Sequence, residues 1–228
     1  MRRQLLPAIM AVVLFTAVTV VYVLATTFFD AAAFSDKADG SFVRDARGRV
    51  VGSSLIGQGF TKAKYFHPRP AADAYASGPD DSYGSNYGPT NPALVADCLP
   101  VQETDKAGNP VVDKAGKPVY ETHKDGSRVC DPNTVPQRVK AYRAENHLAA
   151  DVPVPVDAVT ASGSGLDPGI SVANAKLQAP RVAAARGLGV AKVLSLVKES
   201  TDERTFGILG EPAVDVLELN LALDRLTR

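Results

Sequence analysis

A serine-glycine loop is the part of the sequence whose residue types and spacing come nearest to a chemical site. Residues 161–171 read ASGSGLDPGIS, in which Ser162, Gly163, Ser164 and Gly165 precede an Asp-Pro-Gly turn. Successive backbone amides in such a loop can form an anion-binding nest, so one interpretation is a site for phosphate. The other is a structural turn, which we favour because glycine-rich turns far outnumber phosphate sites.

No other motif assembles a catalytic centre. The 3 histidines, His67, His123 and His147, are scattered, and none has metal-ligand spacing with another histidine or a cysteine. No serine lies in a G-x-S-x-G elbow, and no Walker lysine follows the Ser-Gly run. We therefore expect no catalytic residue, no metal site and no bound cofactor of the chain's own.

Aromatic and basic residues suggest a docking surface. The segment KYFHPRP contains Tyr65, Phe66 and Arg69, and a later turn-rich loop contains Tyr83 and Tyr87. Tyrosine, phenylalanine and arginine are favoured in the cores of protein interfaces. The alternative is ordinary packing of the Tyr65 and Phe66 rings, with Arg69 exposed.

The first thirty residues predict a membrane anchor. Residues 5–29 carry no charge, and about 20 helical residues suffice to cross a bilayer core. A cleaved signal peptide is the alternative, since residues 31–33 are three alanines. Because signal peptides are apolar over only about 7–15 residues, we favour a retained span, with residues 1–30 as the anchor.

Charges beside the span bear on its orientation. Arg2 and Arg3 precede it and Asp30 follows it, which favours a cytoplasmic N-terminus. Four basic residues behind the span favour the opposite orientation: Lys37, Arg44, Arg47 and Arg49. Long domains cross largely regardless of charge, so we expect residues 31–228 to form an extracytoplasmic domain.

The 2 cysteines, Cys98 and Cys130, bracket a segment with its own character. It holds a duplication, DKAGNPVV at residues 105–112 and DKAGKPVY at 113–120, in which each unit joins an Asp-x-x-Gly turn to a β-prone tail. We expect a small β-meander inserted at about residues 98–130, closed by a Cys98–Cys130 disulfide in an oxidising compartment. The alternative is two unrelated buried thiols.

The rest of the chain predicts one mixed α/β domain. Residues 41–57 read as two short strands around a turn, and Thr134 is placed to cap a helix. Ser171 can begin a helix that Gly187 ends, with a kink or break near Gln178 because Pro180 lies inside it.

Three further elements follow from periodicity and proline. Residues 152–160 contain two prolines and are expected to be extended. Residues 190–200 have the spacing of an amphipathic helix. Residues 214–224 alternate apolar and polar residues as a half-buried strand does. The apolar residues change from even to odd positions between Val216 and Leu217, which indicates a bulge or burial on both faces there.

Overall composition limits the partners. The chain of 228 residues has 25 basic and 25 acidic residues, so it lacks the global basic field that nucleic acid or anionic lipid would attract. Nucleic acid is therefore not an expected partner.

Five motifs in order resemble one known family. They are GSSLIGQGF…YFHPRP at 52–70, GSNYGPTNPAL at 84–94, VTASGSGLDPGIS at 159–171, RVAAARGL at 181–188 and LGEPAVDVLELNLALD at 209–224. Behind a single N-terminal span, they closely resemble the KdpC family, the C subunits of bacterial potassium-transporting P-type ATPases. The resemblance covers nearly the whole chain apart from the insertion.

The resemblance implies an accessory subunit of a high-affinity potassium importer in the cell inner membrane. Its expected partners are a potassium-selecting, channel-like subunit and an ATP-hydrolysing P-type subunit, and it has no known catalysis of its own. The family has also been described as a catalytic chaperone that raises the ATP affinity of the pump subunit, with ATP at the Ser-Gly loop, here residues 162–165. An extracytoplasmic loop cannot reach cytoplasmic ATP, so the two expectations exclude each other. A free-standing anchored binding module is a third alternative.

Overall fold

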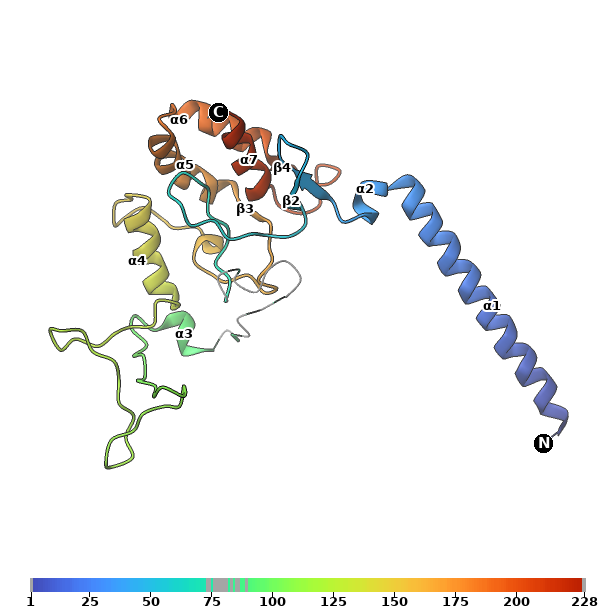
Figure 1. Cartoon of the computed structure of the whole chain (residues 1–228), viewed down its shortest axis with the longest axis horizontal. Helices are drawn as coiled ribbons and strands as arrows, with labels where there is room; N and C mark the ends of the chain where they lie inside the picture. Colours follow the sequence, from blue (N-terminus) through green and yellow to red (C-terminus); the bar gives the residue numbers. More distant parts are fainter. Residues whose placement is uncertain are drawn as a thin grey trace. The chain divides into compact units, whose positions relative to one another are not determined.

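The computed structural model describes residues 2–72, 75, 82, 84, 87–88 and 90–226. It divides into two compact units, Met1–Leu55 and Ile56–Arg228, which are drawn together in Figure 1. The boundary at residue 30 between anchor and domain stays a prediction.

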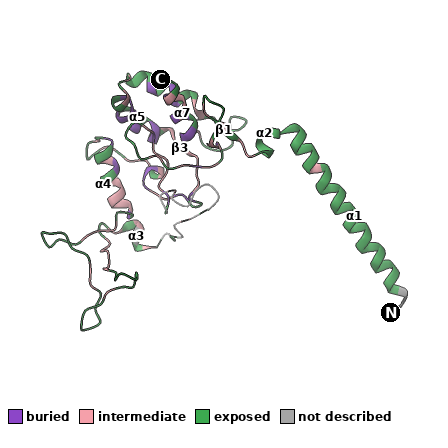
Figure 2. Ribbon diagram, viewed as in Figure 1, coloured by how far each residue is buried: buried purple, intermediate pink, exposed green. Residues whose placement is uncertain are grey.

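The first unit begins with a long helix, α1 (Arg2–Ala33), followed by one short helix, α2 (Ser35–Ala38). Within α1, Gln4–Ala33 is long and apolar enough to cross a membrane, and Figure 2 shows this helix exposed almost throughout. Exposed apolar side chains on every face are expected of a helix that lipid surrounds. The chain is thus a candidate single-pass membrane protein.

A β-hairpin completes the first unit, as predicted. Strand β1 (Phe42–Arg44) pairs antiparallel with β2 (Val50–Ser53). The Asp45 carboxylate accepts hydrogen bonds from the backbone amides of Arg47 and Arg49 in the connecting turn. Gly48 takes the positive φ of 77° that this turn requires.

The second unit is a mixed α/β domain built around a small antiparallel sheet. Its strands are β3 (Gly169–Ser171), β4 (Thr201–Asp202) and β5 (Ala213–Asp215), in the order β3-β5-β4. Three helices pack with them: α5 (Val172–Arg186), α6 (Val190–Glu199) and α7 (Val216–Leu226). Buried residues gather in this part of the molecule (Figure 2). The core comprises Phe66, Ile170, Ala175, Ala179, Val182, Ala183, Val193, Leu196, Val197, Val214, Val216, Leu219 and Leu223.

Helix α5 begins and ends where the sequence predicts. The Ser171 hydroxyl accepts a hydrogen bond from the Asn174 amide, and Gly187 ends the helix with a φ of 63°. Of the predicted kink or break near Gln178, the break is wrong, because the helix continues through Pro180; the kink stays a prediction. Packing of the buried residues on both sides of the proline keeps the helix intact.

The predicted C-terminal strand is also wrong in most of its length. Only β5 is extended, and α7 begins at Val216, the point where the apolar parity changes. The buried residues of α7 have helical spacing: Val216, Leu217, Leu219, Asn220 and Leu223. The Asp215 carboxylate accepts a hydrogen bond from the Glu218 amide at 2.7 Å and so caps this helix.

A second, smaller apolar cluster lies beside the core. Helix α4 (Val135–Glu145) is capped by Thr134, as predicted, and contributes Tyr142 to this cluster. The segment expected to be extended contains one turn of 3₁₀-helix, η1 (Val156–Ala158). Pro155 precedes this turn, a place where proline's missing amide is not needed. A short helix, α3 (Pro92–Val95), lies before the insertion.

The inserted segment forms three short hairpins instead of a continuous meander, and these make the branched outline in Figure 1. Their tips close at the bridges Thr104↔Pro110, Val112↔Pro118 and Thr122↔Arg128. The hairpins meet through rings of backbone hydrogen bonds. In one ring the amide of Glu103 donates to Val119, that of Val119 to Val111, and that of Val111 to Glu103.

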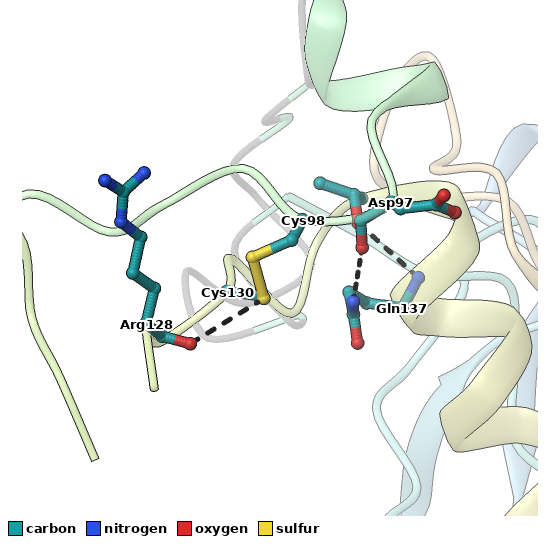
Figure 3. The surroundings of a disulfide bond; sticks show 6 residues. Asp97, Cys98, Arg128, Cys130 and Gln137 are labelled. Carbon is teal, nitrogen blue, oxygen red and sulfur yellow. Dashed lines mark hydrogen bonds between the residues drawn. A yellow bond between two sulfur atoms is a disulfide. The ribbon is translucent and has the colours of Figure 1, made fainter. Parts of the chain in front are cut away.

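A disulfide between Cys98 and Cys130 closes the base of the insertion (Figure 3). Beside it, the Gln137 side chain of α4 donates a hydrogen bond to the Asp97 carbonyl. The insertion is therefore tied to the domain at its two ends, next to the start of α4.

Candidate functional site

The segment at residues 64–71, which we call the strap, crosses the domain without regular secondary structure. Two side-chain amides hold its backbone. Asn220 of α7 accepts from the Phe66 amide at 2.8 Å and donates to the Phe66 carbonyl at 3.0 Å. Gln178 of α5 does the same for His67, at 2.8 and 3.1 Å. Each amide replaces the neighbouring strand that would otherwise satisfy these backbone groups.

Arg181 of α5 supports the same segment from beneath. Its guanidinium donates to the carbonyls of Ala63 and Tyr65 and to the side chains of Asn146 and Gln178. Burial lowers the pKa of this guanidinium, but these acceptors favour its charged form. The polar groups beneath the strap are therefore matched to one another, which makes the strap a rigid feature.

A further network joins α4 to α5. The Tyr142 hydroxyl donates to Asn174 Oδ1 at 2.7 Å, and the side-chain nitrogen Nδ2 of Asn174 donates to the Asp157 carboxylate at 3.0 Å. Burial, with a smaller contribution from Asp157, raises the pKa of the Tyr142 phenol. Tyr142 therefore stays protonated and acts as a hydrogen-bond donor.

The predicted docking residues occupy different environments. Tyr65 donates its hydroxyl to Asp224 at 3.0 Å, and the guanidinium of Arg186 lies 5.1 Å from the centre of its ring. Phe66 is 0% exposed and lies in the core, so its ring has no surface to offer a partner. Tyr87 is 40% exposed. Tyr83 lies outside the described residues.

Arg69 connects the strap to the Ser-Gly loop. Its guanidinium pairs with Asp167 at 2.6 Å, and both side chains are about one third exposed or less. Gly57 lies against the same loop, where its amide donates to the Leu166 carbonyl at 2.8 Å. A Cβ at Gly57 would lie 2.4 Å from the Asp167 carbonyl oxygen, so only glycine fits.

The Ser-Gly loop makes many of its hydrogen bonds to itself. Ser162 is buried, and its hydroxyl accepts from the Gly165 amide at 3.0 Å. The Ser164 hydroxyl accepts from the Leu166 amide at 3.1 Å and lies 3.4 Å from an Asp167 carboxylate oxygen. The Ser162 amide donates to the Pro70 carbonyl at 2.9 Å, so two amides of the expected nest, those of Ser162 and Gly165, already have partners. The adjacent Asp167 carboxylate would also repel a phosphate. The described contacts are those of a structural turn.

A groove runs between the strap and α4. It consists of two adjoining pockets of about 300 and 250 Å³, which share His67, Pro68, Pro70, Asn133 and Arg138 as lining residues. Its walls combine proline and aromatic side chains with polar and charged ones, among them Arg69, Arg138 and Glu145.

Charged groups give this groove a polar edge. His67 Nδ1 lies 2.9 Å from a Glu145 carboxylate oxygen, and the hydrogen bond from His67 lowers the pKa of Glu145. Burial lowers the pKa of the Arg138 guanidinium. Among the residues that the structure describes, no group of three or more His, Cys, Asp or Glu side chains could hold a metal ion.

Sequence reasoning missed the buried amide side chains that hold the strap and join α4 to α5. Asn220 stands within the leucine run of residues 217–223, and Asn174 and Gln178 are four residues apart in α5. Each is a polar residue at a buried position of an otherwise apolar helical face. That signal was available, since a buried amide requires partners.

Comparison with known proteins identifies close relatives. The family model described as "KdpC: K+-transporting ATPase, c chain" matches residues 5–134 and 131–225. A Potassium-transporting ATPase KdpC subunit of Mycobacterium tuberculosis (strain ATCC 25618 / H37Rv) is 48% identical, over 99% of this chain and 100% of its own length. One from Caulobacter vibrioides (strain NA1000 / CB15N) is 42% identical, over 98% of this chain and 94% of its own. A KdpC subunit from Myxococcus xanthus is 44% identical, over 90% of this chain and 79% of its own length.

Proposed function

The chain belongs to the KdpC family of potassium-transporting ATPase subunits, and from this premise we propose that it is an accessory subunit that assembles and stabilises its complex. Its partners are the potassium-selecting, channel-like subunit and the ATP-hydrolysing P-type subunit. The protein performs no catalysis of its own. It holds the other subunits together through its span and its α/β domain.

The observation that carries this proposal is the use of the family motifs as scaffold. Asn220, from the motif LGEPAVDVLELNLALD, holds Phe66 of the motif YFHPRP by two hydrogen bonds. Arg69 of YFHPRP pairs with Asp167 of the Ser-Gly motif. The motifs thus maintain one rigid shape, which suits a subunit that acts by docking.

We place the domain on the extracytoplasmic side of the cell inner membrane, with the N-terminus in the cytoplasm. Arg2 and Arg3 before the span and Asp30 behind it support this orientation. The bond between Cys98 and Cys130 supports it as well, because disulfides persist in oxidising compartments and are rare in the bacterial cytoplasm.

Copurification tests the proposal. The full-length chain, tagged at its C-terminus and extracted in a mild detergent, should bring down both partner subunits in a constant ratio. A single-span protein of the same host with the same tag serves as control. Recovery of the chain without either partner would refute the accessory role.

The alternative is a catalytic chaperone that binds ATP through residues 162–165. The internal hydrogen bonds of the loop and its Asp167 carboxylate count against it. Gly163 gives a suitable test because a Cβ there would have nothing within 4 Å, so an added side chain starts in open space. For the Gly163→Val variant we expect an unchanged ATP concentration at half-maximal pumping. An increase of about tenfold would favour the alternative.

A further inference from the structure

A short hairpin at residues 204–211, which we call the tip hairpin, joins β4 to β5. Thr205 and Leu209 exchange both backbone hydrogen bonds, at 2.9 and 3.0 Å, and the Gly207 amide donates to the Arg204 carbonyl at 2.9 Å. An ion pair between Arg204 and Glu211, at 2.6 Å, closes its base. The tip hairpin is a defined turn mounted on the central sheet.

Three large apolar side chains project from this turn. Phe206 is 89% exposed, Ile208 74% and Leu209 58%. The backbone of Phe206 has a φ of 55°, a left-handed conformation that is unfavourable for an aromatic residue. Neither feature stabilises the isolated domain, and contiguous exposed apolar groups in a defined turn mark an interaction site.

The charges around the tip hairpin are mainly acidic. Asp202, Glu203 and Glu211 are exposed there, against one basic residue, Arg204. Such a flank opposes contact with a bilayer surface, since anionic lipids repel it. It also opposes a symmetric contact with a second copy of the chain, because the same acidic flank would then face itself.

We propose that the tip hairpin inserts Phe206 and Ile208 into an apolar pocket with a basic rim on another subunit of the ATPase. This inference rests on the proposed accessory function and adds the surface that performs the docking. The partner's pocket must receive an aromatic ring and a branched side chain from positions two residues apart, and its basic residues pair with the acidic flank.

Photocrosslinking in native membranes identifies what the tip hairpin contacts. The photoreactive analogue p-benzoylphenylalanine replaces Phe206 in the full-length chain, and Val112, which is 55% exposed in the insertion, serves as the control position. We expect a crosslink to the channel-like or the ATP-hydrolysing subunit from position 206 and none from position 112. A crosslink to lipid only, to a second copy of the chain, or to nothing would overturn the inference.

A pair of matched variants separates this inference from the proposed function. Phe206→Ser with Ile208→Ser removes the apolar tip, whereas Val112→Ser with Val156→Ser removes exposed apolar groups elsewhere. We expect the tip variant to reduce recovery of the partner subunits about tenfold or more and the control to leave it unchanged. Unchanged recovery with the tip variant would overturn the inference alone. Absence of partners from the unmodified chain would overturn the accessory function itself.

Discussion

Replacing Asn220 by leucine is expected to destabilise the domain through the backbone of Phe66. The Asn220 side chain accepts from the Phe66 amide at 2.8 Å and donates to its carbonyl at 3.0 Å, and both residues are almost completely buried. Leucine has nearly the same volume but offers neither a donor nor an acceptor. Each buried backbone group that loses its partner costs about 1–3 kcal/mol, so the loss is about 2–6 kcal/mol in the free energy of unfolding.

Urea unfolding of the full-length chain in detergent micelles measures this loss, followed by far-ultraviolet circular dichroism. The matched control is Asn109→Leu, at an exposed position of the insertion where the side chain donates one exposed hydrogen bond to Asp105, for which we expect a change of about 1 kcal/mol or less. If Asn220→Leu prevents folding, hydrogen exchange of the unmodified chain provides the test, because the Phe66 amide should be protected although it lies outside any helix or strand. A loss below about 1 kcal/mol, or rapid exchange at Phe66, would refute the reasoning.

Three further predictions concern the disulfide, helix α7 and the Ser-Gly loop. Replacing Cys98 and Cys130 by alanine opens a loop with a sequence separation of 32, which should destabilise the insertion by about 3–4 kcal/mol. In the native protein, non-reducing peptide mapping of membranes should find the two cysteines joined, and two free thiols would contradict this. Burial raises the pKa of Asp215 to about 6 from its ordinary 3.8, so the folded state binds this proton more tightly than the unfolded state, and stability from this group is lost as pH rises from about 4 through about 6. The free energy of unfolding of Asp215→Asn, measured by urea unfolding and taken relative to the parent protein, should therefore rise by about 3 kcal/mol between pH 3.5 and 7.5. A difference between variant and parent that does not change with pH would refute the assignment. Gly57→Ala should lower the free energy of unfolding by about 2 kcal/mol or more, because its Cβ clashes with the Asp167 carbonyl. Gly163→Ala meets nothing within 4 Å and should cost less than about 1 kcal/mol in the same assay. Equal costs for the two variants would contradict the described loop.

Local signals predicted much of the fold. Thr134 and Ser171 cap α4 and α5, Gly187 ends α5, and Gly48 allows the turn of the first hairpin. In each case, one side chain or one backbone conformation decides the local structure, so the information lies within a few residues. The long apolar run of α1 belongs to the same class, because length and hydropathy suffice to identify it.

Tertiary packing decided the elements that sequence reasoning missed. Residues 214–224 alternate as a strand does, but the buried set of Val216, Leu219 and Leu223 also fits a helix, and short apolar runs are ambiguous between the two. Pro180 should disrupt an isolated helix, but burial of Ala179 and Val182 on either side holds α5 together. Neither outcome is encoded in the neighbouring residues alone.

The candidate site was predicted only in its parts. The Ser-Gly loop and the strap were both singled out, but their connection through Arg69 and Asp167 joins residues 98 positions apart in sequence. Likewise, the amides of Gln178 and Asn220 meet the strap across 111 and 154 positions. Such contacts depend on the complete fold, which explains why Phe66 was proposed for docking although it lies in the core.

Protease protection of the α/β domain tests the central claim most directly, namely that this subunit acts on assembly from outside the membrane and not on ATP. Intact right-side-out spheroplasts and inverted membrane vesicles are digested in parallel, and the domain is followed through a C-terminal tag. We predict digestion in spheroplasts and protection in inverted vesicles. Digestion only in inverted vesicles would place residues 162–165 in the cytoplasm and contradict the account.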